Sequence, residues 1–197
     1  MTFQYPAIGE TFFKGVYKLP EGHYFTYRDG KMDIHRYYDE DFREGKQKLG
    51  ELVNSIDQTV CDSVKAHQIA DVEVGSFLSS GVDSSYVAAV ARPQHTYSIG
   101  FGKGTYNESQ QAGELAELLK LNNTAESLTD EEAFAAFPRI QWHLDEPDSN
   151  PSCVPLYFLS ALAAKDVKVV LSGEGATSCS PDTSTTACTP NSGPSRW

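Results

Sequence analysis

Along the chain, the spacing of apolar residues changes from segment to segment between the alternation typical of β-strands and the period typical of α-helices. Near the N-terminus, two alternating stretches, 24–27 and 32–38, flank Arg28-Asp29-Gly30-Lys31. Asp-Gly between alternating stretches predicts a β-hairpin, because its tight turn needs the positive φ angles that these residues tolerate. A hairpin alone is marginally stable, so we expect it to pack on the body of the protein or on a further domain.

A long helical pattern follows, from about residue 41 to residue 67. Its apolar residues recur at helical spacing, while Lys, Glu, Gln and Asp fill the other positions. They are Leu49, Leu52, Val53, Ile56, Val60 and Val64. A stripe of this kind is typical of a helix that packs one face against a core, and we predict core packing for it.

Strand and helix patterns then alternate as far as residue 171. Strands are predicted over 72–78, 96–101 and 167–171, and helices over 84–91, 108–121, 129–137 and 155–165. Thr129 and Glu132 have the spacing of a capping box. The alternation predicts an α/β fold in which helices flank a parallel sheet. In such sheets ligands bind beyond the carboxyl ends of the strands, and Gly- and Ser-rich turns follow Leu78, Phe101 and Leu171.

Composition narrows the function classes. The 197 residues include 16 Lys and Arg against 27 Asp and Glu, a formal net charge of −11. This balance argues against a nucleic-acid partner, which would need clustered basic residues. No apolar stretch approaches the roughly 20 residues of a membrane span, so we expect no membrane association and a cytoplasmic location. The four cysteines form no CxxC pair, which argues against a zinc site or a disulfide framework.

The turn after the strand over 72–78 carries the main chemical signal. It reads Leu78-Ser79-Ser80-Gly81-Val82-Asp83-Ser84-Ser85 and opens a helix. Small side chains allow the backbone to approach a phosphate group, and the amides and dipole of the helix start supply positive charge. Ser79 and Ser84 add hydroxyl donors, and Asp83 fits if it holds Mg²⁺ on a pyrophosphate. The alternative is an ordinary strand–helix turn with serine caps.

This turn resembles the SGGxDS pyrophosphate loop of the N-type ATP pyrophosphatases, with Ser80 in place of the first Gly. Two further signatures follow in order: Ile140–Pro147, continued by Pro155–Phe158, and Val169–Ala176. With the segment 11–24, they make residues 3–176 similar to the C-terminal synthetase domain of the asparagine synthetase (glutamine-hydrolysing) family. The resemblance implies an adenine nucleotide α-hydrolase-like fold.

The resemblance also implies a reaction. The side-chain carboxylate of aspartate attacks the α-phosphate of ATP, giving β-aspartyl-AMP and pyrophosphate, and ammonia from a glutaminase domain then displaces AMP to give asparagine. By position, the nucleotide would be bound by Leu78, Ser79, Gly81, Asp83, Ser84, Ile99, Ser172 and Gly173. Asp83 would hold Mg²⁺, and Glu174 would be a catalytic group near the adenylate. For Leu78 and Ile99 plain core packing is the alternative.

One acidic group receives no such role. Asp145, Glu146 and Asp148 lie close together beside Trp142 and His143. Because like charges repel each other and solvated loops are often charged, we interpret this group as a solvated loop and assign no aspartate binding to it.

The resemblance ends after Ala176. The family continues with an Asp-Glu-Leu-Phe-type run whose Asp is a second metal ligand, whereas this chain continues with Thr-Ser-Cys-Ser-Pro-Asp-Thr. The codons GAC GAG CTG TTC GCC GGA TAC encode the family run and, read from their second base, encode the run found here. We therefore hypothesise a one-base frameshift after Ala176.

These observations predict three regions. Residues 1–40 would be a β-hairpin linker from a glutaminase domain that is missing here, 41–176 a partial synthetase domain, and 177–197 a disordered aberrant tail. Such a fragment would bind ATP weakly and have little or no activity; the intact enzyme is compatible with a homodimer. The alternatives are another adenylating ligase with the same loop, such as a β-lactam synthetase, or a non-catalytic or misfolded nucleotide-binding remnant. The Trp142–Pro147 segment favours asparagine synthetase.

Overall fold

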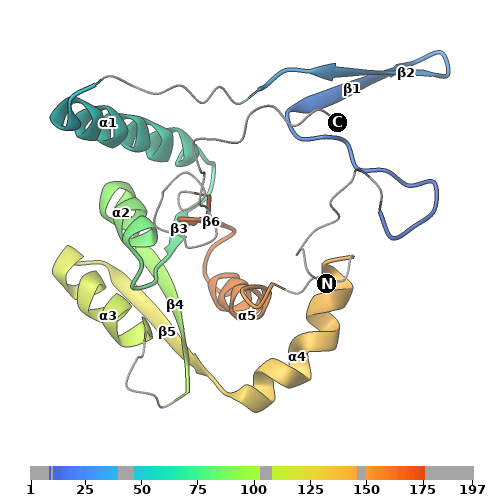
Figure 1. Ribbon diagram of the computed structural model, residues 1–197. Helices are drawn as coiled ribbons and strands as arrows, with labels where there is room; N and C mark the ends of the chain where they lie inside the picture. The colour runs from blue at the N-terminus through green and yellow to red at the C-terminus, as the bar shows by residue number, and fades with distance from the viewer. Residues whose placement is uncertain (1–8, 10, 40–46, 103–107, 146–149, 176–197) are drawn as a thin grey trace.

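The computed structural model describes residues 9, 11–39, 47–102, 108–145 and 150–175. These residues form two separate sheets, an antiparallel hairpin and a four-stranded parallel sheet flanked by helices (Figure 1). The fold class predicted from the alternating pattern is therefore confirmed. In the described segments no helix combines the length and the apolar character that a membrane crossing requires.

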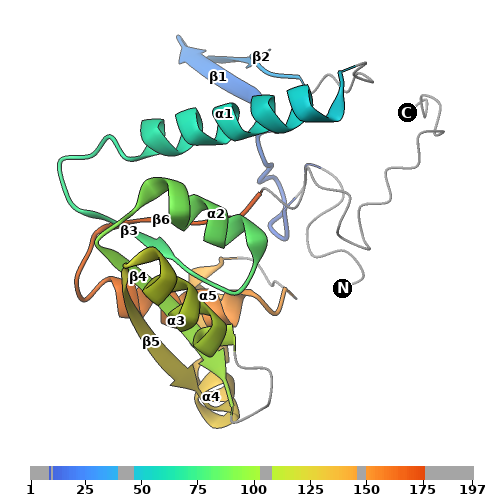
Figure 2. The same ribbon diagram turned by 90° about the vertical axis from the view of Figure 1, so that its left-hand side faces the viewer.

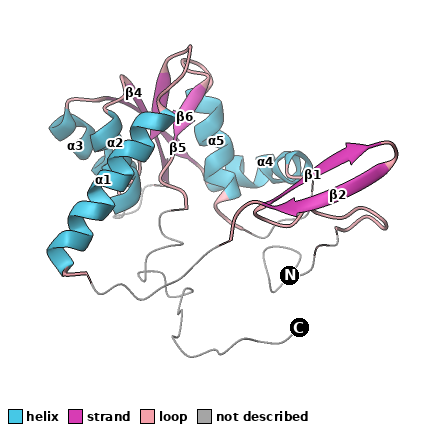
Figure 3. Ribbon diagram, turned by 90° about the horizontal axis from the view of Figure 1, so that it is seen from above, coloured by secondary structure: helices cyan, strands magenta, loops and turns pink. Residues whose placement is uncertain are grey.

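The hairpin consists of β1 (His23–Arg28) and β2 (Lys31–Arg36). Its turn forms as predicted, with φ angles of 52° at Asp29 and 76° at Gly30. The expectation that it packs on the body is not met, because Phe25 and Ile34, which pair across the two strands, are both exposed. Figure 3 shows the hairpin standing apart from the parallel sheet.

Helix α1 (Leu49–His67) begins where a carboxylate oxygen of Glu51 accepts from the Lys48 N–H at 3.4 Å. The predicted start near residue 41 lies outside the described residues, but residues 47 and 48 are not helical. Helix α1 lies across α2 (Val82–Ala91), as Figure 2 shows, and the Tyr86 hydroxyl of α2 donates to Asp57 of α1.

The predicted core stripe of α1 is wrong for most of its length. Val64 is buried, whereas Leu49 is 77% exposed. The side chains of Leu52, Val53 and Ile56 are exposed as well. Helical periodicity identifies an apolar face but not the surface that covers it, and α2 reaches only part of this helix.

The parallel sheet has the strand order β5-β4-β3-β6. Its strands are β3 (Val74–Phe77), β4 (His95–Phe101), β5 (Asn122–Leu128) and β6 (Val169–Leu171). Strand β3 lies between β4, which follows it in the chain, and β6, which comes much later. In α/β sheets the crevice beside such a change of direction is the usual ligand site.

Strand β5 was not predicted. Its sequence, Asn-Asn-Thr-Ala-Glu-Ser-Leu, has no apolar alternation, and most of its side chains are exposed at the sheet edge. The strand exists because all seven of its residues pair with β4. This pairing uses backbone N–H and C=O groups, which every residue type has, so the pattern of apolar and polar residues does not predict it.

Helices cover both faces of the sheet. Ala88 of α2 and Ala112 and Ala116 of α3 (Glu108–Leu119) pack around Leu78 in one core cluster. Leu162 and Ala163 of α5 (Cys153–Ala163) pack against Tyr97 in a second one. The two clusters keep the ends of β3 and β4 in place between the layers.

Helix α4 (Asp130–His143) starts at the predicted capping box. The Thr129 hydroxyl accepts from the Glu132 N–H at 3.2 Å, and the Glu132 carboxylate accepts from the Thr129 N–H at 2.9 Å. The Thr129 N–H and the Thr129 hydroxyl both donate to the Glu132 carboxylate, and these two bonds lower the pKa of Glu132 because they favour its charged form. The helix extends beyond the predicted end at residue 137, because Pro138 is accommodated inside it.

Candidate functional site

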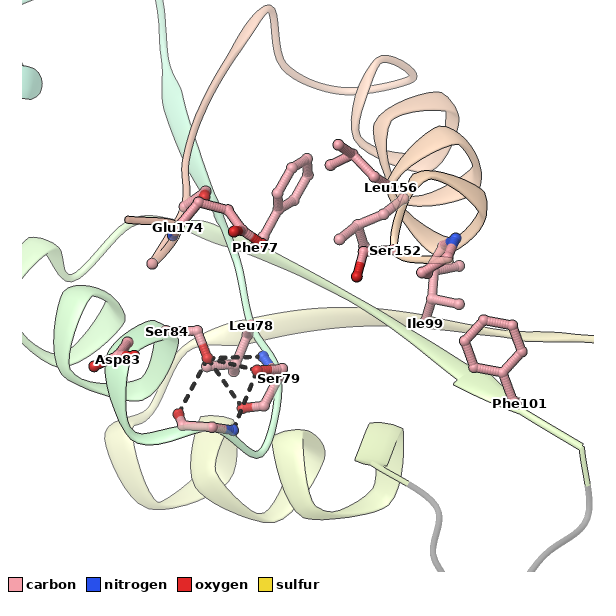
Figure 4. A pocket seen from close by; sticks show the side chains of 15 residues that line it. Phe77, Leu78, Ser79, Asp83, Ser84, Ile99, Phe101, Ser152, Leu156 and Glu174 are labelled. Atoms are coloured by element: carbon pink, nitrogen blue, oxygen red, sulfur yellow. Dashed lines mark hydrogen bonds between the residues drawn. The ribbon is translucent and has the colours of Figure 1, made fainter. Parts of the chain in front are cut away.

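A pocket of about 390 Å³ lies beyond the carboxyl ends of β3, β4 and β6 (Figure 4). All nine residues predicted from the sequence to form the site line it. They are Leu78, Ser79, Gly81, Asp83, Ser84, Ile99, Ser172, Gly173 and Glu174. The structure thus brings together residues nearly one hundred positions apart in the chain; their individual roles stay predictions.

The turn between β3 and α2 leaves backbone donors without partners. Gly81 is the N-cap of α2 and has no side chain that could cap it. The first intrahelical bond runs from the Ser85 N–H to the Gly81 carbonyl at 3.1 Å. Among the described residues no acceptor meets the N–H groups of Val82, Asp83 and Ser84. Unused donors at the positive end of a helix dipole form a site for an anion.

Two serines fix the shape of this turn. The hydroxyl oxygens of Ser79 and Ser84 are 2.7 Å apart, and the Ser79 N–H donates to the Ser84 hydroxyl at 3.2 Å. The Gly81 N–H donates to the Ser79 hydroxyl at 3.1 Å, so that these bonds close a small ring (dashed lines in Figure 4). The ring leaves the three free amides of α2 outside it.

Ser80, which departs from the family pattern, is accommodated without strain. It is not among the residues with positive φ, so that its side chain imposes no backbone penalty. It lines a different pocket, between α2 and α3, rather than the one that holds the nine residues. The replacement of Gly by Ser therefore does not fill the candidate site.

The turn after β6 touches the start of α2 directly. A Cβ atom added at Gly173 would lie 2.7 Å from the Ser84 nitrogen and 2.9 Å from the Asp83 carbonyl carbon. Both neighbours are backbone atoms, so that only glycine permits this contact. The Glu174 N–H donates to the Ser172 hydroxyl at 3.0 Å, and the Glu174 side chain is exposed at the pocket.

The opposite end of the pocket is apolar. Leu78 is 2% exposed and belongs to the core, and it also lines the pocket. Figure 4 shows Ser79, Asp83 and Ser84 at one end and Phe101 at the other.

Six lining residues were not predicted from the sequence: Phe77, Phe101, Ser152, Pro155, Leu156 and Leu159. A signal for two of them existed, since Pro155 and Leu156 belong to a motif already noted. Phe77 and Phe101 lie at the carboxyl ends of two predicted strands, and Leu159 lies in a predicted helix, but the sequence did not show that their side chains face the pocket. Ser152 lies outside every predicted element.

Beside this apolar end, strand β4 has backbone groups that meet no partner in the part of the chain that the structure describes. The Leu78 N–H donates to the Tyr97 carbonyl at 2.9 Å, whereas the Gly102 N–H donates to the Leu128 carbonyl of β5 at 3.2 Å. Residues of β4 therefore direct their peptide groups alternately toward β3 and β5. Ile99, which lines the pocket, therefore directs its N–H and C=O toward the β3 side, beyond the end of β3, and neither group has a backbone partner among the described residues.

The pocket has carboxylates that could bind a metal ion together with the phosphate oxygens of a ligand. Asp83 and Glu174 both line it. No group of three or more His, Cys, Asp or Glu side chains in the described segments could hold a metal ion. Mg²⁺ at nucleotide sites takes one or two carboxylates together with phosphate oxygens, and this donor set fits Asp83. Asp145 is exposed at the end of α4, and Glu146 and Asp148 lie outside the described residues.

Comparison of the sequence with known proteins identifies the family to which the chain belongs. Residues 55–178 match the asparagine synthase family model. The chain belongs to the asparagine synthase family. It is 38% identical over 181 residues to asparagine synthetase [glutamine-hydrolyzing] 1 of Bacillus subtilis, which covers 89% of this chain and 29% of that protein. The chain thus spans less than a third of the length of this relative.

Other relatives are more distant. Asparagine synthetase B of Escherichia coli is 27% identical over 183 residues, 81% of this chain and 32% of that protein. Amidase chry2 of Gibberella zeae is also 27% identical, over 191 residues, 84% of this chain and 28% of that protein. Among solved structures, an NMN synthetase from Francisella tularensis aligns at a TM-score of 0.41 and 20% identity, over 64% of this chain and 54% of that one.

Proposed function

We propose that the pocket binds ATP with Mg²⁺ and is the site at which the β-carboxylate of aspartate is adenylated during asparagine synthesis. The observation that carries this proposal is the set of three amides at the start of α2 that have no acceptor within the described segments and that lie next to the turn at Gly173. Membership of the asparagine synthase family supports the choice of reaction.

The amides act on the leaving group. A carboxylate oxygen of aspartate forms a bond to the α-phosphorus, and the bond between that phosphorus and the oxygen bridging to the β-phosphorus breaks. The negative charge that develops on the departing pyrophosphate lies against the N–H groups of Val82, Asp83 and Ser84. Donors that are already in place stabilise such charge without reorganisation. Bound Mg²⁺, held by Asp83, would neutralise part of it.

The apolar end suits the base. An adenine ring would lie against Leu78 and Leu156, with its N1 accepting from the Ile99 N–H and its exocyclic amine donating to the Ile99 carbonyl. A purine with a carbonyl in place of that amine would set two acceptors against each other, so that the same edge discriminates against guanine.

Glu174 serves the second half-reaction. Ammonia attacks the acyl carbon of the adenylate, and AMP leaves with the electron pair of the acyl–phosphate bond. The carboxylate of Glu174, exposed at the pocket, takes the proton that the attacking nitrogen loses. Aspartate and glutamine-derived ammonia are thus the proposed substrates. We expect slow turnover in this chain, because the run 177–183 replaces the acidic residues of the family pattern.

Calorimetric titration and isotope exchange test the proposal. ATP with Mg²⁺ should give saturable binding heat, and labelled pyrophosphate should enter ATP only when aspartate is present. Absence of binding heat at high protein concentration would contradict the assignment. Binding without exchange would support a non-catalytic nucleotide-binding protein.

One relative of this chain is named an amidase, which makes a second substrate worth testing. Exchange supported by another carboxylic acid and not by aspartate would favour a different adenylating ligase. The same assay, run in parallel with the two kinds of acid, separates the two functions.

A further inference from the structure

A second cavity opens next to the apolar end of the nucleotide pocket. It measures about 570 Å³ and lies between α4 and the start of α5. Phe101, Ser152 and Pro155 line both cavities and form a common wall. The two spaces are therefore neighbours that share three lining residues.

The lining of the second cavity is mostly apolar, with Asn150 and Ser152 as its polar residues. Ala133, Phe134 and Phe137 of α4 face Pro151 and Val154 across it, and none of its described lining residues is charged. Phe134, one of these lining residues, is 80% exposed. A group that enters this cavity would be uncharged and apolar, unlike the phosphates at the other end of the site.

The backbone of β4 determines which part of the base is nearest to this cavity. Along the strand the Ile99 N–H comes first, then its carbonyl, and then Phe101. A base that pairs its N1 with the N–H and its exocyclic amine with the carbonyl carries the amine on the Phe101 side. The amine therefore lies toward the wall that the two cavities share.

We propose that the second cavity extends the base site and accepts an apolar group carried on the exocyclic amine of an adenine nucleotide. N6-benzyl-ATP is the probe of this class. A singly substituted amine keeps one N–H for the Ile99 carbonyl, while its benzyl group enters the space lined by Phe134 and Phe137. This inference rests on the proposed nucleotide site, and it adds a ligand class to that site.

Competition binding to the full chain in the presence of Mg²⁺ tests the inference. N6-benzyl-ATP should bind at least as tightly as ATP. Ala133→Phe, which fills the second cavity, should weaken N6-benzyl-ATP about tenfold, the size expected for loss of an apolar group from a fitted pocket, and leave ATP unchanged. Ala135→Phe, on the same helix but outside the lining, is the matched control and should change neither affinity.

The outcomes separate the two proposals. If ATP binds and N6-benzyl-ATP binds more than about tenfold more weakly, the extended site is wrong and the nucleotide site stands. If neither binds, the proposed function fails and this inference fails with it. If Ala133→Phe does not fold, as judged by circular dichroism, the comparison of the two nucleotides on the unmodified chain still decides the matter.

Discussion

Two helices start at the same pocket, and their first turns differ in what they can bind. At α2 the N–H groups of Val82, Asp83 and Ser84 have no acceptor among the described residues. At α5 the Asn150 side chain accepts from the Ser152 N–H at 3.0 Å, and the carbonyls of Asn150 and Pro151 accept from the next two amides. Pro155, in the same turn, has no N–H at all.

The comparison shows that a helix N-terminus becomes an anion site only when its donors are unused. Both helices have a dipole with its positive end at the pocket, but the local sequence of α5 satisfies its amides within the protein. The pocket is accordingly polar beside α2 and apolar beside α5, as a nucleotide requires.

The largest expected effect follows from Gly173→Ala. The added methyl group would meet backbone atoms of Ser84 and Asp83, so that the turn and the start of α2 must move apart. We expect at least a tenfold loss of ATP affinity and a stability loss of about 1–3 kcal/mol, which is typical of overpacking. Gly113→Ala, where an added Cβ meets no atom within 4 Å, is the control and should retain binding.

Asp83→Asn should have the next largest effect. Loss of the carboxylate removes the proposed ligand of Mg²⁺, so that affinity for ATP with Mg²⁺ should fall about tenfold, as for loss of one charged contact. Titrations with and without Mg²⁺ measure the difference. Equal losses in the two titrations would show that Asp83 does not act through the metal.

Ser84→Ala should weaken binding less. It removes the acceptor of the Ser79 N–H and opens the ring that shapes the turn, which should cost about 1 kcal/mol, or roughly fivefold in affinity. Ser85→Ala is the matched control, because the Ser85 hydroxyl donates to the Gly81 carbonyl and does not line the pocket. An equal effect of the two variants would argue against a role for the ring.

Asn150→Ala should leave nucleotide affinity nearly unchanged. It removes the side-chain acceptor at the start of α5 and should lower the free energy of unfolding by about 1 kcal/mol, as for a lost helix cap. A thermal melt measures the stability, and titration measures the affinity. A large loss of ATP binding would mean that α5 also contributes to the anion site.

The sequence predicted those structural features that are set by residues close together in the chain. The Asp29-Gly30 turn and the Thr129–Glu132 capping box are set by neighbouring residues, and both formed as predicted. The nine site residues gathered because each lies just beyond or near the carboxyl end of a strand, which a parallel topology brings to one edge.

What the sequence missed depends on partners far along the chain. Strand β5 is polar and exists through its pairing with β4, and most of the apolar face of α1, apart from Val64, has no covering surface among the described residues. Phe101 and Ser152 meet at the pocket only because α5 packs over the end of β4. None of these relations appears in the local pattern of residue types.

The most direct test follows individual backbone amides by ¹⁵N-resolved NMR during titration with pyrophosphate and Mg²⁺. The largest shift changes should occur at the amides of Val82, Asp83 and Ser84, and those of Cys153 and Val154 should stay within the background. Changes centred on the start of α5, or spread evenly over the chain, would contradict the assignment of the anion site to α2.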